Sequence, residues 1–153
     1  MNRLEYRAGI TAIIINNKEE ILAGYKILFK GWELPQGGLD DNETTIDCCY
    51  REIWEEFGIS KDKLELIAFT KGFIKYDIPE NKKGTEWFQG QMKKWYLLKF
   101  IGTENDINLN AFETPEFSEL KWVKPVEMLD TVVDFKRESY RSAFDELGIY
   151  IGS

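Results

Sequence analysis

The sequence has no histidine and only two cysteines, which are adjacent at positions 48 and 49. Zinc sites take most of their ligands from these two residue types, so their scarcity argues against a typical zinc site. Neighbouring residues on a helix point in different directions, which argues against a disulfide between Cys48 and Cys49. We therefore expect no disulfide framework, and this composition favours a reducing compartment.

Long apolar runs are also missing. No segment approaches the ~20 apolar residues that are needed to cross a bilayer. The N-terminal segment MNRLEYRAG lacks the apolar core of a signal peptide. We therefore expect a cytoplasmic protein with no membrane partner.

Positive charge is in deficit, because 20 Lys and Arg residues stand against 27 Asp and Glu residues, for a formal net charge of −7. Proteins that coat a long polyanion need many contacts from Lys and Arg to phosphates. No long face for binding nucleic acid is therefore expected. An acidic protein can still bind a phosphorylated substrate if metal ions neutralise its carboxylates and a few cations gather around the pocket.

The 153 residues are 43% hydrophobic and 14% aromatic, which is enough for one substantial core, and no segment has the composition of a linker. The sequence thus predicts a single domain over residues 1–153. Strands are predicted at residues 7–15, 21–25, 64–76, 93–100 and 119–123, and helices at residues 45–57, 125–129 and 136–147. Strands interspersed with helices in this way predict a mixed sheet between helices.

The central feature is the predicted helix at residues 45–57, which Gly58 ends and which either Asn42 or Thr44 caps. Just before it, Pro35 and the glycine pair Gly37-Gly38 are expected to break regular structure. Glycine lets the backbone approach a ligand closely. The polar segment at residues 76–92 is expected to border the same site.

Three glutamates of this helix, Glu52, Glu55 and Glu56, project within roughly 100° of one another, on the flank away from the apolar stripe. Like charges at this spacing repel one another. Arg51 is expected at the far edge of the acidic arc, so bound divalent cations explain the crowding better. Oxygen ligands suit Mg²⁺ or Mn²⁺. The alternative is an ordinary solvated acidic face.

The pattern from Gly37 to Ile59 is G-x5-E-x7-R-E-U-x-E-E-x-G-U, where U is aliphatic. It resembles the Nudix box at every defined position. The resemblance implies an α/β/α sandwich and a Nudix hydrolase, which cleaves a diphosphate linked to another moiety. It also implies that Glu52, Glu55 and Glu56, with Gly37, bind two or more Mg²⁺ or Mn²⁺ ions, and that Glu43 either pairs with Arg51 or lies near the metals.

Further motifs are similar to the branch of RNA pyrophosphohydrolases and dinucleoside-polyphosphate hydrolases. They are Tyr6-Arg7, the run from Trp32 to Gly38, the run from Tyr76 to Pro79, the run from Gly90 to Tyr96, the run from Thr114 to Phe117 and the run from Val132 to Arg137. The chain departs from this branch at Asp41-Asn42, where relatives often have Pro-Gly, and at Lys26, where Arg is frequent. The first is expected to be a harmless turn variant, whereas Lys26 lacks the planar face of Arg.

The resemblance implies that water attacks a phosphorus of a 5' polyphosphate and that a carboxylate takes its proton. Glu52 and Glu116 are both candidates for this base, and Glu116 is alternatively an extra metal ligand. The substrate phosphates are expected at Gly37-Gly38 and at three cations. These cations are Arg7, Lys136 and Arg137.

The nucleobase is expected between Phe135 and the Lys26 side, with Tyr76 near its edge. In the alternative, Phe135 is a core residue at the last helix. The predicted substrate is the 5' end of a triphosphorylated RNA, with dinucleoside polyphosphates as further substrates. Other nucleoside triphosphates, nucleotide sugars, a catalytically silent binding module and a plain acidic interaction domain remain alternatives, and the sequence predicts no oligomeric state.

Overall fold

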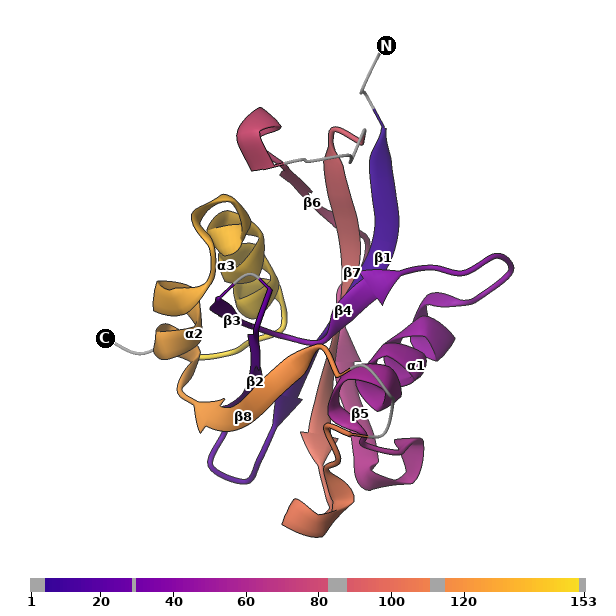
Figure 1. The fold of residues 1–153 in the computed structure, drawn as a ribbon, viewed down its shortest axis with the longest axis vertical. Coiled ribbons are helices and arrows are strands. Elements are labelled where there is room, and N and C mark those ends of the chain that lie inside the picture. The colour runs from indigo at the N-terminus through magenta and orange to yellow at the C-terminus, as the bar shows by residue number, and fades with distance from the viewer. Residues whose placement is uncertain (1–4, 29, 83–87, 111–114, 152–153) are drawn as a thin grey trace.

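The computed structural model describes residues 5–28, 30–82, 88–110 and 115–151. A mixed β-sheet forms the middle layer, with α1 on one side and with α2 and α3 on the other (Figure 1). The predicted α/β/α sandwich is therefore confirmed.

The described strands are β1 (Tyr6–Ile15), β2 (Ile21–Lys26), β3 (Gly31–Glu33), β4 (Gln36–Gly38), β5 (Leu64–Phe69), β6 (Ile74–Asp77), β7 (Gly90–Phe100) and β8 (Phe117–Val123). The described α-helices are α1 (Thr45–Phe57), α2 (Pro125–Thr131) and α3 (Arg137–Glu146). A 3₁₀ turn, η4 (Asp134–Lys136), directly precedes α3.

The sheet branches at β1. The strand order is β3-β2-β1-β7-β5, β4 also pairs with β1, and β6 also pairs with β7. β1 and β7 run parallel along their whole length, from Tyr6 opposite Gly90 to Ile15 opposite Lys99. β4 pairs antiparallel with the middle of β1, from Gly9 opposite Gly38 to Thr11 opposite Gln36. The glycines of β4 are therefore held beside Gly9 and Ile10, where the sheet meets α1.

Alternation along the strands fills a core on each face of the sheet. Ile10, Ile14 and Leu98 face α1, together with Cys49 and Phe57 of that helix. Ile13, Trp95 and Leu97 face α2 and α3, where they pack with Tyr140 and Phe144. This arrangement confirms the prediction that the strand at residues 93–100 is covered on both faces.

Two predictions about strands are wrong. The predicted strand over residues 64–76 is two strands, β5 and β6, because Thr70 turns the chain between them. The Thr70 backbone N–H donates to the Trp95 carbonyl at 3.0 Å, and its hydroxyl donates to the Gly72 carbonyl at 2.8 Å. The supposedly irregular segment before α1 contains β3 and β4, on either side of Leu34 and Pro35. Of the polar segment at residues 76–92, positions 83–87 lie outside the described residues.

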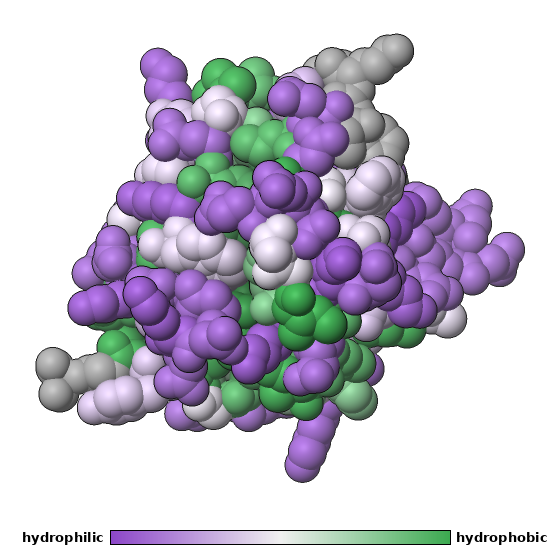
Figure 2. Space-filling view, turned by 90° about the horizontal axis from the view of Figure 1, so that it is seen from below, coloured by the Kyte–Doolittle hydropathy of each residue, from purple (hydrophilic) through white to green (hydrophobic). Residues whose placement is uncertain are grey.

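No helix among the described residues is long and apolar enough to cross a membrane. On the face seen from below in Figure 2, hydrophilic residues dominate and hydrophobic residues form separate patches between them.

Candidate active site

Helix α1 is held at both ends by its own sequence. The Thr44 hydroxyl accepts a hydrogen bond from the Asp47 backbone N–H at 3.2 Å, so Thr44 is the N-cap. Asn42 instead takes a left-handed conformation, with φ 63°, in the preceding turn. Asparagine tolerates this conformation better than most residues, which fits a turn variant. Gly58 ends the helix, also left-handed, with φ 66°.

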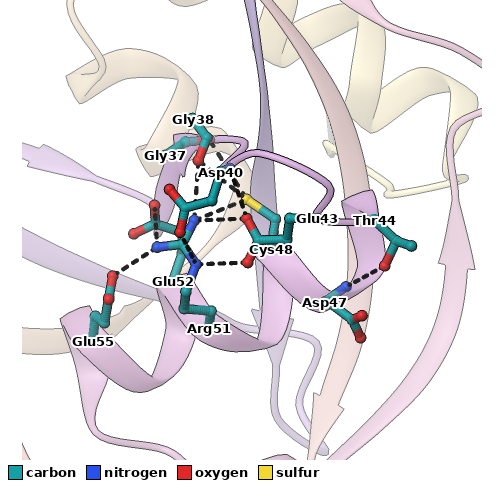
Figure 3. A network of polar contacts seen from close by, with 10 residues as sticks. All are labelled: Gly37, Gly38, Asp40, Glu43, Thr44, Asp47, Cys48, Arg51, Glu52 and Glu55. Atoms are coloured by element: carbon teal, nitrogen blue, oxygen red, sulfur yellow. Dashed lines mark hydrogen bonds and ion pairs between the residues drawn. The ribbon is translucent and has the colours of Figure 1, made fainter.

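Arg51 lies at the centre of the polar network that links α1 to the glycine strand β4 (Figure 3). Its Nε and Nη2 donate to the two oxygens of Glu43 at 2.7 and 3.0 Å. Its Nη2 also donates to the Gly38 carbonyl at 3.0 Å. Of the two positions expected for Glu43, the structure has the pair with Arg51. Arg51 lowers the pKa of Glu43 to about 2, mainly through these hydrogen bonds.

The expectation that Arg51 lies at the far edge of the acidic arc is wrong. Its Nη1 donates to Glu55 at 3.0 Å and to Glu52 at 3.3 Å. Helical spacing predicts the Cα positions, but it does not show that the Arg51 side chain is long enough to reach both carboxylates. Two of the three box glutamates thus share one guanidinium.

Glu52 lies directly against the backbone of Gly37. A Cβ atom on Gly37 would stand 1.7 Å from Glu52 Oε2, so a side chain at position 37 would force the Glu52 carboxylate to move. Burial is the main cause that raises the pKa of Glu52 to about 7; Arg51 opposes this shift, and Glu55 adds to it. A carboxyl with this pKa holds its proton far more readily than an exposed one.

Glu56 is almost fully buried, with 3% of its surface exposed. Its Oε2 accepts a hydrogen bond from the Gln36 backbone N–H at 3.0 Å, whereas its Oε1 has no partner among the described residues. Burial, followed by the charges of Glu52 and Glu116, raises the pKa of Glu56 well above its ordinary value. A buried carboxylate oxygen without a partner is costly unless a ligand completes it.

The carboxylates of Glu52, Glu55 and Glu56 are ligands of the type that a divalent cation prefers, but they do not converge on one point. All provide oxygen donors, and Oε1 of Glu56, which is buried and has no hydrogen bond to another described residue, is the clearest candidate ligand atom. No three acidic side chains among the described residues converge at the spacing of a metal site. Two of these carboxylates, Glu52 and Glu55, are instead paired with Arg51.

A second group of charges joins β2, β3 and η4. The buried Glu33 accepts a hydrogen bond from Lys136 Nζ at 2.8 Å. Lys26 Nζ lies 3.6 Å from Glu33 Oε2 and 3.6 Å from Glu116 Oε2. Glu116 is half-exposed, just before β8, and its charge also raises the pKa of Glu56. The structure therefore brings Glu116 and Lys26 to the box glutamates.

The two predicted aromatic contacts lie together. The Phe135 and Tyr76 rings are 5.9 Å apart and inclined at 44°, and Lys136 Nζ lies 5.6 Å above the Tyr76 ring. The Tyr76 hydroxyl donates to Gln91 Oε1 at 2.8 Å. Phe135 is half-buried rather than in the core. Its predicted contact with a nucleobase stays a prediction.

Arg137 does not join the other predicted cations. Its Nε and Nη2 donate to the carbonyls of Leu129 and Val132, and its Nη1 donates to Asp134. These bonds satisfy carbonyls at the end of α2 and use one N–H of each guanidinium nitrogen, so Nη1 and Nη2 each keep a second donor. The prediction that Arg137 holds a phosphate stays a prediction.

The family model described as the NUDIX domain matches residues 5–143. The chain belongs to the Nudix family. Curated Nudix relatives named RNA pyrophosphohydrolase include one from Erythrobacter litoralis, 39% identical over 94% of this chain and 91% of its own length. Another, from Dinoroseobacter shibae, is 36% identical over 93% of this chain and 91% of its own length.

Solved structures share the Nudix fold at low sequence identity. A binary complex of the Ap4A hydrolase from C. elegans has a TM-score of 0.68 at 18% identity, and covers 91% of this chain and 95% of its own. The dihydroneopterin triphosphate pyrophosphohydrolase of E. coli has a TM-score of 0.71 at 16% identity, and covers 90% and 95%. Identities this low show the fold alone.

Sequence reasoning missed two charged residues that the Nudix fold buries at this site, Glu33 and Lys93. Glu33 lies within the quoted run from Trp32 to Gly38, but nothing local sets it apart. Lys93 had a usable signal. Strict alternation along β7 places Lys93 on the same face as the buried residues Trp95 and Leu97.

We predict that Glu43→Gln lowers stability at pH 7 by about 1.5 to 3 kcal/mol, the usual loss for a hydrogen bond to a charged group. The folded pKa of Glu43 is about 2, below its ordinary value of 4.5. The unfolded chain therefore binds more protons between these values, and the stabilisation is complete above pH 4.5 and is lost as the pH falls toward 2.

Urea unfolding of both proteins from pH 7 to pH 2.5 tests this prediction. The difference between wild type and variant should shrink across that window. Glu65→Gln, at an exposed position of β5, is the control and should stay near the wild type. A difference that does not change with pH would mean that Glu43 stabilises the loop by its shape rather than by its charge.

Proposed function

We propose that this Nudix hydrolase removes pyrophosphate from the 5'-triphosphorylated end of RNA. Water adds to a phosphorus, the phosphoanhydride bond breaks, and a 5' monophosphate and pyrophosphate result. One observation carries the proposal. The box carboxylates on α1 lie close to two lysines on other elements, Lys26 and Lys136. The curated relatives named RNA pyrophosphohydrolase, 36 to 39% identical, support RNA as the substrate.

Nudix hydrolases generally use divalent metals such as Mg²⁺ or Mn²⁺. Our proposal for this chain is two or more such ions, held by Glu52, Glu55 and Glu56 with the Gly37 carbonyl. Such ions, when bound, lower the pKa of water and neutralise charge on phosphate oxygens. Glu56 provides the anchor, because its Oε2 is fixed by the Gln36 backbone and its Oε1 is free.

Two carboxylates are placed to take the proton from the attacking water. Glu52 has a pKa of about 7, which suits a base at neutral pH, but it is partly held by Arg51. Glu116 is more exposed, and its Oε2 lies 3.6 Å from Lys26 Nζ. We propose Glu116 as the base, because a carboxylate that binds metal has fewer lone pairs left for a proton.

The substrate's first base is proposed to stack on Phe135, with Tyr76 at its edge and Lys26 on the other side. Lys136 lies beside both aromatic rings, and Arg7 lies against Gly38 at the entrance to the carboxylates. The polyphosphate would thus run from the aromatic pair toward α1.

The direct test is product analysis of the purified chain with Mg²⁺ or Mn²⁺. The panel is 5'-triphosphorylated RNA, diadenosine tetraphosphate and the deoxynucleoside triphosphates. We expect pyrophosphate and 5'-monophosphorylated RNA, with the highest kcat/KM on RNA. A higher kcat/KM on a deoxynucleoside triphosphate would make that nucleotide the substrate instead of RNA. If no member of the panel releases phosphate or pyrophosphate when metal is added, a catalytically silent binding module would be favoured.

Glu56→Gln should lower activity by at least about 100-fold, because even the partners of metal ligands contribute about 10- to 100-fold. The same variant should melt at a higher temperature in metal-free buffer, by about 2 to 4 °C per kcal/mol of relieved burial and repulsion. Asp47→Asn, at an exposed position of the same helix, is the control. Wild-type turnover of Glu56→Gln at limiting Mg²⁺ would refute the metal role.

Glu116→Gln should lower kcat by about two to four orders of magnitude, the usual range for a general base. The dependence of activity on Mg²⁺ concentration should change little. A large rise in the Mg²⁺ requirement, with near-normal turnover at saturation, would instead make Glu116 a metal ligand. Unchanged kinetics in both respects would remove Glu116 from the site.

Phe135→Ala should weaken substrate binding by about five- to a hundredfold, since stacking of a base is worth ~1 to 3 kcal/mol. Inorganic triphosphate, which has no base, should be affected much less. Both affinities are measured by competition against hydrolysis of triphosphorylated RNA. Equal losses for the two ligands would indicate a folding defect, and unchanged affinity for RNA would rule out stacking on Phe135.

A further inference from the structure

Lys93 is a buried lysine that none of the roles above uses. Only 3% of its surface is exposed. Along β7, Tyr96 and Leu98 face α1, whereas Trp95 and Leu97 face the other core. Alternation therefore places Lys93 on the face that η4 and α3 cover. Burial of an ammonium group lowers the stability of the fold unless an anion compensates the charge, so we looked for the anion that Lys93 could bind.

The Lys93 ammonium group reaches the glycine strand β4. A Cβ atom on Gly9 would stand 2.8 Å from Lys93 Nζ and 2.2 Å from the Gly37 carbonyl oxygen. Gly37 in turn lies against Glu52 Oε2. Lys93 thus crosses the start of β1 and ends beside the strand that faces the box carboxylates. Glycine at position 9 is what leaves room for the lysine.

Two further cations share this place. In the parallel register, Arg7 lies opposite Gln91 and Gly9 lies opposite Lys93, so Arg7 and Lys93 are on one face of the sheet. The Arg7 guanidinium lies 3.0 Å from the position of a Cβ on Gly38. Burial, followed by the charges of Lys136 and Arg7, lowers the pKa of Lys93 to about 8. The three groups therefore repel one another.

No carboxylate relieves Lys93 directly. Its ammonium group has no hydrogen bond and no ion pair with another described residue, whereas Lys136 is bonded to Glu33. Glu52 attracts it only weakly in comparison with its burial. Three cations gathered on one face, one of them buried without an anion, form a site that an external anion would complete.

We propose that Lys93, with Arg7 and Lys136, binds the polyphosphate of the substrate and selects for substrates that carry three or more phosphates in a row. This inference rests on the proposed function and names the residue that sets its phosphate requirement. Lys136 lies at the aromatic pair, and Lys93 lies between it and the box carboxylates. A phosphate chain that joins a base at Phe135 to α1 must pass over Lys93.

The number of cations explains the preference for a triphosphate end. Arg7, Lys93 and Lys136 provide three positive charges in addition to any metal ion at α1. A 5' triphosphate supplies enough anionic oxygens for all of them, whereas the diphosphate of a nucleotide sugar leaves part of the cation set without a partner. An unpaired buried cation lowers affinity, so the site discriminates against the shorter chain.

The test compares Lys93→Gln with the control Lys94→Gln. Lys94 is the next residue of β7 but lies on the opposite face, over the rings of Phe69 and Tyr96. Lys93→Gln should raise the KM for 5'-triphosphorylated RNA by about 10- to 100-fold, the loss expected for a charge-assisted hydrogen bond, with a smaller change in kcat. The KM for a nucleotide sugar should change less. Lys94→Gln should match the wild type.

A second measurement separates this inference from the proposed function. Binding of inorganic triphosphate, measured by calorimetry without divalent metal, should weaken by a similar factor in Lys93→Gln even if the wild type hydrolyses no RNA. Lys93→Gln should also melt at or above the wild-type temperature, because it removes an unpaired buried charge. Unchanged binding of inorganic triphosphate, or a lower melting temperature with equal losses on all substrates, would overturn the role of Lys93.

Discussion

The architecture of the site depends on one guanidinium group. Arg51 joins Glu43 in the preceding loop, the Gly38 carbonyl of β4 and two glutamates of its own helix. Without it, Glu43, Glu52 and Glu55 would lose the cation that they share, and the Gly38 carbonyl would lose its bond to the helix. Because the same contacts hold Glu52 and Glu55, Arg51 also decides how these carboxylates are presented to a metal ion. One side chain thus couples the folding of the Nudix box to its chemistry.

Ion pairs within the site compensate some of its charges, but Glu56 and Lys93 are buried without an ion pair among the described residues. The pKa values of Glu52 and Glu56 are raised, mainly by burial, and the pKa of Lys93 is lowered for the same reason. Each shift means that the folded protein holds a charge less favourably than water does. A packed apolar interior would be more stable, so the arrangement is costly for folding. The missing partners are of the two kinds that a polyphosphate hydrolase brings together, cations for the carboxylates and phosphate oxygens for the lysine.

The branching of the sheet at β1 is what brings the two charge sets together. β1 pairs with β7 on one side and with β4 on the other, so the basic residues at its start lie beside the glycines in front of α1. Glycines at positions 9, 37 and 38 let β1 and β4 approach the charged side chains closely. A side chain at any of these positions would meet a charged group or the backbone. The helices then cover opposite faces, α1 with its carboxylates and η4 with Lys136. The fold therefore separates the groups for metal from the groups for phosphate while keeping them within reach of one substrate.

The sequence by itself determined the features that local chemistry controls: helix α1 with its end at Gly58, the box glutamates, the strands β1, β2 and β7, and the sandwich that these elements imply. It left two candidates for the cap, and the structure has Thr44. Hydrophobic period and capping residues act within a few positions, so they can be read directly. Only the tertiary structure decided the rest. β3 and β4 are too short to be strands except through pairing with β2 and β1, and Thr70 breaks a strand because of its bonds to a distant one. Periodicity reports which residues share a face but not what packs against that face. For that reason the position of the Lys93 ammonium group beside β4, and the contacts of Arg51 with Glu52 and Glu55, are visible only in the tertiary structure.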